Sequence, residues 1–170
     1  MQRLLIVFIC LFSFGTVNAQ DSSVNFIIKN LGVNVDGHFN EFTISTDFNS
    51  EGELNTIAST IEVSSIETGI ESRDEHILEE DYFDVKQYLT ITLKSIEIKV
   101  VKPNHYDIEA SLTIKGKTKK VTIPVTVQKM DGNYKITSYF EINRRDFDVG
   151  GGGFVMGKIV KINVTHYQHI

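Results

Sequence analysis

The chain has 170 residues, and its 17 lysines and arginines stand against 22 aspartates and glutamates, for a formal net charge of −5. A mildly acidic chain with no basic cluster is a poor match for nucleic acid and for anionic membrane surfaces. The length suits one domain, and a single cysteine excludes a disulfide framework, so the domain must be stabilised by its core.

The first residues show the order of features of a secretory signal peptide. A positive charge precedes an apolar run at residues 4–14, which is too short to span a bilayer, and small residues follow up to Ala19. We therefore expect cleavage after Ala19, a leader of residues 1–19, and one mature domain of residues 20–170 in the periplasm or outside the cell. No later segment has the length and apolarity of a transmembrane helix, and the only cysteine, Cys10, leaves with the leader.

Alternation of apolar and polar residues with a period of two dominates the mature chain, which is the pattern of strands that bury one face. The alternating apolar positions are Val24, Phe26 and Ile28; Ile57, Ile61 and Val63; Leu89, Ile91 and Leu93; Tyr106, Ile108, Ala110, Leu112 and Ile114; Val121, Ile123, Val125 and Val127; Tyr134, Ile136, Phe140 and Ile142; and Val160, Ile162 and Val164. Turn signals separate these runs at Asp36-Gly37, Glu51-Gly52, Lys115-Gly116, Asp131-Gly132 and the glycines of 150–153. The pattern indicates an all-β sandwich or an up-and-down barrel, and alternation alone does not choose between them.

One segment departs from the strand pattern. Ser72 is followed three residues later by Glu75, the form of a capping box in which each side chain bonds the backbone amide of the other residue. Ile77 and Leu78 then supply apolar residues. The spacing predicts a short helix over about residues 73–80, lying against one end or side of the sheet.

Three groups of residues have the composition of a reactive or ligand-binding site, and each has a simpler interpretation. Asp74 and His76 lie two apart, so on a helix they do not share a face as an acid–base pair would. His166 and His169 lie near the C-terminus, where a strand would direct them to opposite faces. The glycines of 150–153 precede a strand instead of the helix of a phosphate-binding loop, which favours a hairpin loop at a barrel rim. We expect no catalytic residue, no metal and no cofactor.

Blocks of residues spread along the chain also match, in order, the signatures of a known family. They are residues 26–32, Gly37-x-Phe39-x-x-Phe42, residues 66–69, Arg73-Asp74-x-His76-Ile77, residues 81–85, residues 112–119, and Ile142-Asn143-Arg144-x-Asp146-Phe147 with Gly157. On these blocks the chain resembles the YceI-like family of bacterial polyisoprenoid-binding proteins, from about Val24 to Val164. It departs from the family at Asn30, where histidine is usual, at Leu89, where proline is usual, and at Asp148, where glycine is common. The last two departures change the backbone freedom at the barrel mouth.

The resemblance implies an extended, antiparallel, eight-stranded, lipocalin-like β-barrel with a pocket for an isoprenoid quinone, a polyprenyl phosphate, or a fatty acid or its amide. It implies no catalysis. A long chain can bind tightly with few polar contacts, because each buried CH₂ contributes about 0.8 kcal/mol. The residues that we expect to line the apolar pocket are Phe26, Phe39, Phe42, Ile61, Phe83, Ile91, Ile108, Ala110, Leu112, Ile123, Val125 and Phe140.

Two other functions are compatible with the sequence. A structural or interaction barrel would have a filled core and no ligand, and an enzyme of lipid or quinone metabolism would use Arg73, Asp74 and His76. A homodimer would follow if the apolar rows pointed outward, because exposed rows of this length promote association. If they point inward and line a pocket, Ala110→Phe should displace the ligand and leave the lipid-free protein nearly as stable as before.

Overall fold

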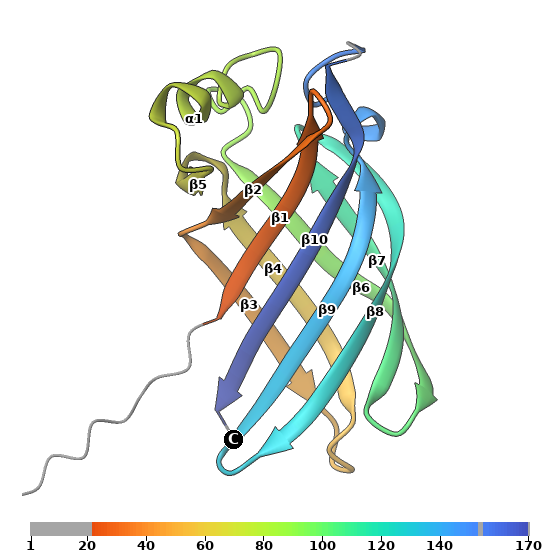
Figure 1. The fold of residues 1–170 in the computed structure, drawn as a ribbon. Helices are drawn as coiled ribbons and strands as arrows, with labels where there is room; N and C mark the ends of the chain where they lie inside the picture. Colours follow the sequence, from red (N-terminus) through yellow and green to blue (C-terminus); the bar gives the residue numbers. More distant parts are fainter. Residues whose placement is uncertain (1–21, 153–154, 170) are drawn as a thin grey trace, which may run out of the picture.

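The structure is a computed structural model that describes residues 22–152 and 155–169, and in it one antiparallel sheet curls into a barrel with a short helix at one end (Figure 1). The predicted leader and its cleavage point lie outside the described residues. Within the described part of the chain, no helix is long and apolar enough to cross a membrane.

The sheet contains ten strand segments. They are β1 (Ser23–Asn30), β2 (Val33–Phe39), β3 (Phe42–Phe48), β4 (Leu54–Glu62), β5 (Ile66–Glu67), β6 (Thr90–Lys102), β7 (His105–Ile114), β8 (Lys117–Met130), β9 (Asn133–Asn143) and β10 (Met156–His169). Their order across the sheet is β3-β4-β6-β7-β8-β9-β10-β1-β2-β5, and every paired segment is antiparallel to its neighbour.

The chain closes the barrel where this order ends. β2 continues into β3 through Asn40 and Glu41, and β4 continues into β5 through a 3₁₀ turn, η1 (Val63–Ser65). The segments β2 and β3 together form one long strand that bends at a corner, and β4 and β5 form another. These two bent strands pair along their length, because β3 pairs with β4 and β2 pairs with β5. The Asn40 amide donates to the Ser65 carbonyl across this corner, at 3.0 Å. Counting each bent strand once, the ten segments form the eight antiparallel strands of the expected barrel, and the predicted fold is confirmed.

The helix differs from its prediction in both position and cap. α1 (Glu71–Ile77) begins and ends earlier than the expected span of 73–80. The predicted capping box is wrong, because the N-cap residue is Ile70, which has no side-chain oxygen, and Ser72 lies inside the helix. The helix therefore begins without a hydrogen bond from the side chain at its cap.

A different acidic side chain stabilises this turn. The Asp74 carboxylate accepts hydrogen bonds from the backbone amide of Thr68, at 3.0 Å, and from the Thr68 hydroxyl. Between them Gly69 has a φ of +82°, which glycine adopts without steric cost. Asp74 thus reaches back across the first turn of α1 and ties the start of the helix to the segment just before it.

The end of the barrel away from α1 is filled with side chains. Tyr106 at the start of β7 is buried, and Ile108 and Ala110 further along the strand have no exposed surface. The rings of Phe48 and Tyr134 stack at this end, with their centroids 4.1 Å apart. The end of the barrel nearer α1 is hollow.

Candidate functional site

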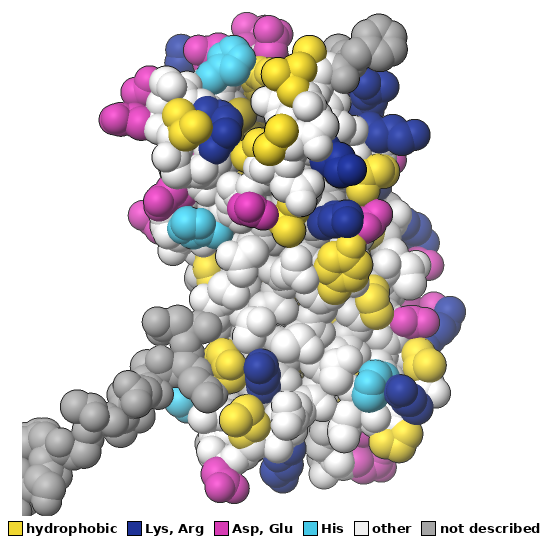
Figure 2. All heavy atoms as spheres, viewed as in Figure 1, with side chains coloured by type: hydrophobic (Ala, Val, Ile, Leu, Met, Phe, Trp, Pro, Cys, Tyr) yellow, Lys and Arg dark blue, Asp and Glu magenta, His cyan; other side chains and the backbone are white. Residues whose placement is uncertain are grey.

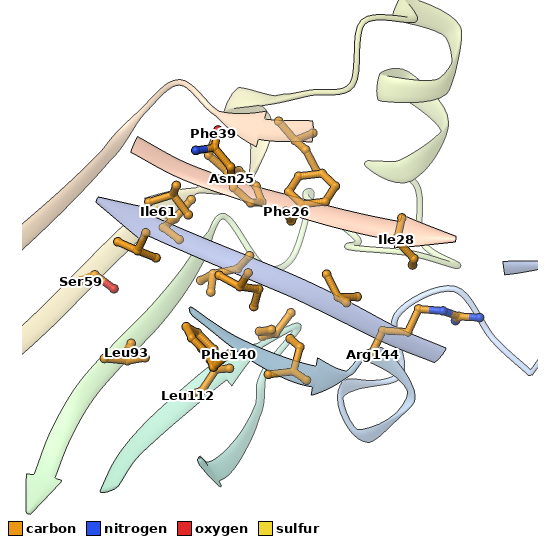
Figure 3. A pocket seen from close by; sticks show the side chains of 18 of the residues that line it. Asn25, Phe26, Ile28, Phe39, Ser59, Ile61, Leu93, Leu112, Phe140 and Arg144 are labelled. Carbon is orange, nitrogen blue, oxygen red and sulfur yellow. The ribbon is translucent and has the colours of Figure 1, made fainter. Parts of the chain in front are cut away.

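A cavity of about 210 Å³ lies inside the barrel (Figure 3). One water molecule needs roughly 10–15 Å³ of such space, so the cavity could hold more than about ten waters or an organic chain of similar bulk. Side chains from all ten strand segments reach it, and its walls are almost wholly apolar. Such walls hold few partners for water and many for hydrocarbon.

The cavity is long and slender. On β10 its wall runs from Met156, near the α1 end, to His166. Ten residues of strand span about 33 Å, and the usual strand tilt of about 40° reduces this to roughly 25 Å along the barrel axis. A volume of about 210 Å³ spread over that length makes the cavity a narrow channel. The site therefore has the form that suits an extended hydrocarbon chain.

Most of the predicted pocket residues lie in the cavity wall. They are Phe26, Phe39, Ile61, Phe83, Ile91, Leu112, Ile123, Val125 and Phe140. The rows of apolar residues on β7, β8 and β9 thus point inward, as expected from their alternation. Their role in binding a ligand stays a prediction.

Three predicted residues lie elsewhere. Phe42 packs against the core at the corner between β2 and β3 and is not part of the cavity wall. Ile108 and Ala110 are fully buried but are not among the residues that line the cavity, although Leu112 in the same row and Ile123, the β8 partner of Ile108, both do. Alternation predicts which face of a strand a residue is on. It does not predict which levels of the barrel interior are filled, because that depends on the volumes of the inward side chains from all the strands. Because Ala110 is fully buried outside the cavity wall, overpacking of the core is the larger expected effect of Ala110→Phe, and its effect on a ligand stays a prediction.

Polar residues at the α1 end of the cavity were not predicted as site residues. Thr68, Arg73, Tyr82 and Arg144 all contribute to the wall there. Arg73 and Arg144 belong to the family blocks, so their place in those blocks was the signal available in the sequence. Alternation could not identify them, because these residues lie in turns, in α1 or beyond the end of a strand.

Arg144 is the most deeply buried of these polar residues, with 3% of its surface exposed. Its guanidinium donates to four backbone carbonyls: those of Val149, Gly151, Met156 and Gly157. Burial lowers the pKa of Arg144 below its usual value, and the neighbouring Arg145 lowers it further. The carbonyl dipoles stabilise the buried charge, and Arg144 in turn holds the glycine-rich loop against the start of β10.

Arg144→Lys tests this clamp. Lysine keeps the charge but lacks the planar fork that reaches several carbonyls at once. We expect the free energy of unfolding to fall by about 1.5–3 kcal/mol, the contribution of one lost hydrogen bond to a charged group. Denaturant titration measures the loss. Arg145→Lys, at the exposed neighbouring position, is the control, and equal effects of the two substitutions would contradict the assignment.

Two buried polar atoms at opposite ends of the cavity lack a hydrogen-bond partner among the described residues. They are Oδ1 of Asn30, beside Met156 on β10, and Nε2 of His166. Nδ1 of His166 lies 3.0 Å from the Ser22 hydroxyl, and burial lowers the pKa of this imidazole. A buried polar atom without a partner is costly, so both atoms are available to a ligand or to bound water.

Of the three residues considered for catalysis, Arg73 and Asp74 meet at Thr68, whereas His76 has a separate partner. Asp74 is hydrogen-bonded to Thr68, and Nδ1 of His76 lies 2.9 Å from the Glu79 carboxylate. Arg73 donates to the hydroxyl and the carbonyl of Thr68. The described residues contain no group of three histidine, cysteine, aspartate or glutamate side chains that could hold a metal ion.

The two departures from the family pattern at the mouth, Asp148 and Leu89, are accommodated in different ways. Asp148 has the left-handed backbone (φ 54°, ψ 32°) that glycine favours, and its carboxylate pairs with Lys117. That hydrogen bond lowers the pKa of Asp148. The Leu89 side chain is exposed, and its carbonyl accepts a bond from the Val63 amide at 2.9 Å.

Comparison with known proteins gives a consistent result. The model of the YceI-like domain matches residues 16–166. A UPF0312 protein of Staphylococcus epidermidis is 30% identical over 173 residues, which cover 91% of this chain and 94% of the relative. UPF0312 proteins of Pseudomonas aeruginosa are 34% identical, but the match spans only 55% of their length.

Solved structures share the fold. The crystal structure of BcnA from Burkholderia cenocepacia has a TM-score of 0.82 and 28% sequence identity, and the match covers 86% of this chain and 96% of BcnA. A polyisoprenoid binding domain from Saccharophagus degradans, described as implicated in plant cell wall breakdown, has a TM-score of 0.68 and 17% identity, with 88% and 94% of the two chains covered.

Proposed function

We propose that this chain, which belongs to the YceI-like domain family, binds one long, single-chain lipid inside its barrel. The observation that carries the proposal is the slender apolar cavity of about 210 Å³ that reaches from Met156 to His166. A polyisoprenoid is the first candidate, because a domain of the same fold is described as polyisoprenoid-binding. An isoprenoid quinone or a fatty-acyl chain has the same long, narrow form.

Apolar burial supplies the affinity. Each CH₂ transferred from water into the cavity contributes about 0.8 kcal/mol, so a chain that fills the length needs few polar contacts. The narrow cross-section favours one chain over the two chains of a membrane phospholipid. Transport, storage and protection of such a lipid are all compatible with a binding protein that performs no reaction.

The polar end of the ligand belongs at the α1 end in this proposal. Asn30 offers a buried, unpartnered oxygen there, and the side chains of Thr68, Arg73 and Tyr82 line the same region. At the other end, the stacked Phe48 and Tyr134 and the buried Tyr106 fill the barrel. The polar head would therefore lie at the end nearer solvent and the chain would extend into the barrel.

The alternatives receive less support. A barrel filled throughout would not leave a cavity of this length, and the cavity is the observation that favours a carrier. An enzyme built on Arg73, Asp74 and His76 would need these side chains around one substrate, whereas Arg73 and Asp74 are both bonded to Thr68 and His76 is paired with Glu79. We also propose that the protein is exported, on the strength of the leader pattern in residues 1–19.

Affinity as a function of chain length tests the proposed ligand. Delipidated protein is titrated with polyprenols of increasing length in dilute detergent, with binding followed by native mass spectrometry. We expect affinity to rise steeply with length, because each added CH₂ contributes about 0.8 kcal/mol, and to level off once the chain exceeds the cavity. A diacyl phosphatidylcholine serves as the control and should not compete. Affinity independent of chain length would contradict a ligand that lies along the barrel.

A further inference from the structure

The hairpin between β1 and β2 has an unusual residue at its tip. Leu31 and Gly32 both have positive φ, 51° and 80°, as a two-residue type I′ turn requires. Asparagine or aspartate is preferred at the first of these positions, because a larger apolar side chain is strained in the left-handed region. Leucine at this position therefore costs stability.

The four other described non-glycine residues with positive φ all have polar side chains, and three of these make polar contacts. Asp84 accepts a hydrogen bond from Gln87, Lys115 donates to two backbone carbonyls, and Asp148 pairs with Lys117. Leu31 has no such compensation, since its side chain is apolar and 76% exposed. A strained, solvent-exposed leucine indicates a function outside the fold itself.

Two further apolar residues surround Leu31. Val33 is 67% exposed and Val155 is 55% exposed, and the Leu31 amide donates to the Val155 carbonyl at 2.8 Å. We name Leu31, Val33 and Val155 the mouth tip. It continues directly into the cavity wall, because Asn30 and Met156, the residues next to it on β1 and β10, both line the cavity.

Charge is distributed unevenly around this end of the barrel. Lys29 on β1 and Lys158 on β10 are exposed beside the mouth tip, and Gly157 packs against Lys29. Figure 2 shows basic side chains next to apolar ones at this end of the barrel, which is at the top of the view. The acidic side chains Glu71 and Glu75 are exposed on α1, across the mouth. The apolar tip thus has cationic side chains directly beside it, on β1 and β10.

We propose that the mouth tip docks on an anionic lipid surface, with Leu31 entering the apolar layer and Lys29 and Lys158 meeting the head groups. The docked barrel would present the mouth of its cavity to the membrane from which the ligand comes. The proposal rests on the proposed lipid-binding function. The sequence has no run of basic residues, and the antiparallel pairing of β1 with β10 is what brings these lysines together.

Leu31→Asn separates docking from folding. Asparagine suits the left-handed turn, so the melting temperature should stay the same or rise. Sedimentation of delipidated protein with phosphatidylcholine vesicles containing phosphatidylglycerol should show binding about tenfold weaker than that of the unsubstituted protein, as expected for the loss of one buried leucine. Val101→Asn is the matched control, because Val101 is 60% exposed on β6 at the opposite end of the barrel. Its binding should not change.

The other outcomes are equally informative. Vesicles of phosphatidylcholine alone should bind less protein, and added salt should weaken binding to the anionic vesicles. The proposal is overturned if the unsubstituted protein does not sediment with either vesicle, as for a tip that docks on a protein partner, or if the two asparagine variants lose binding equally. Polyprenol loading from detergent micelles, measured in parallel, should be unchanged in Leu31→Asn, so that failed docking and failed lipid binding are distinguished.

Discussion

Ser59→Phe is expected to abolish lipid binding without weakening the barrel. Ser59 lies in the cavity wall, between its strand partners Ile44 on β3 and Leu93 on β6, which also line the cavity. A phenyl ring at this position would enter the narrow channel that the lipid would need. Burial of the ring contributes on the order of 1.5–3 kcal/mol, which offsets any local rearrangement.

The measurement for Ser59→Phe has two parts. Lipid extracted from the purified variant should fall by at least about tenfold, since the ring competes for space with chain burial of similar free energy. The melting temperature of the delipidated variant should equal or exceed that of the unsubstituted protein. Ser59→Ala removes the hydroxyl without filling the channel and should retain the lipid. A Ser59→Phe protein that carries the usual amount of lipid would show that the ligand lies elsewhere.

Ala110→Phe adds a larger side chain at a fully buried position outside the cavity wall and should have the opposite pair of effects. Ala110 has no exposed surface and does not line the cavity. Overpacking a filled core costs roughly 1–3 kcal/mol or more, so we expect the urea midpoint to fall clearly. The protein that remains folded should still carry its lipid. If Ala110→Phe instead proves stable and free of lipid, the binding channel extends through the end of the barrel that we describe as filled.

The sequence predicted the architecture because barrel strands have a strong local signal. Alternating rows such as Leu112 and Ile114, or Ile123 and Val125, indicated one buried face per strand, and these residues do point into the cavity. The order of the family blocks then distinguished a barrel from a sandwich. The corner between β2 and β3 was not predicted, because two halves of a bent strand look the same in sequence as two separate strands.

The site was predicted less well, for physical reasons that differ among residues. Ile108 was placed in the pocket because it shares a face with Leu112, but packing around Tyr106 decides which part of that face meets empty space. Ser72 has the pattern of a cap, yet it lies inside α1, and the side chain that bonds the preceding turn is that of Asp74, which accepts from Thr68. Packing among distant strands decided the first case, and the choice between two nearby polar side chains decided the second.

The backbone at the mouth provides a further example. Asp148 replaces a glycine that is common in the family, and the sequence alone could show only that a residue with greater conformational freedom was missing. The structure shows that the aspartate adopts the left-handed conformation and that Lys117 pairs with its carboxylate. The partner comes from the hairpin between β7 and β8, far away in the sequence, and could not be identified from the residues around Asp148.

The most direct test of the account is the mass of what the barrel contains. The full chain is expressed in a bacterial host, purified without detergent and measured by native mass spectrometry, and the extracted lipid is then identified by chromatography and tandem mass spectrometry. We expect about one equivalent of a single-chain lipid of polyisoprenoid, quinone or fatty-acyl type, held in the channel lined by Phe26, Ser59 and Phe140. A protein that is recovered empty and stays empty after incubation with a total lipid extract would contradict the central claim that this barrel is a lipid-binding protein.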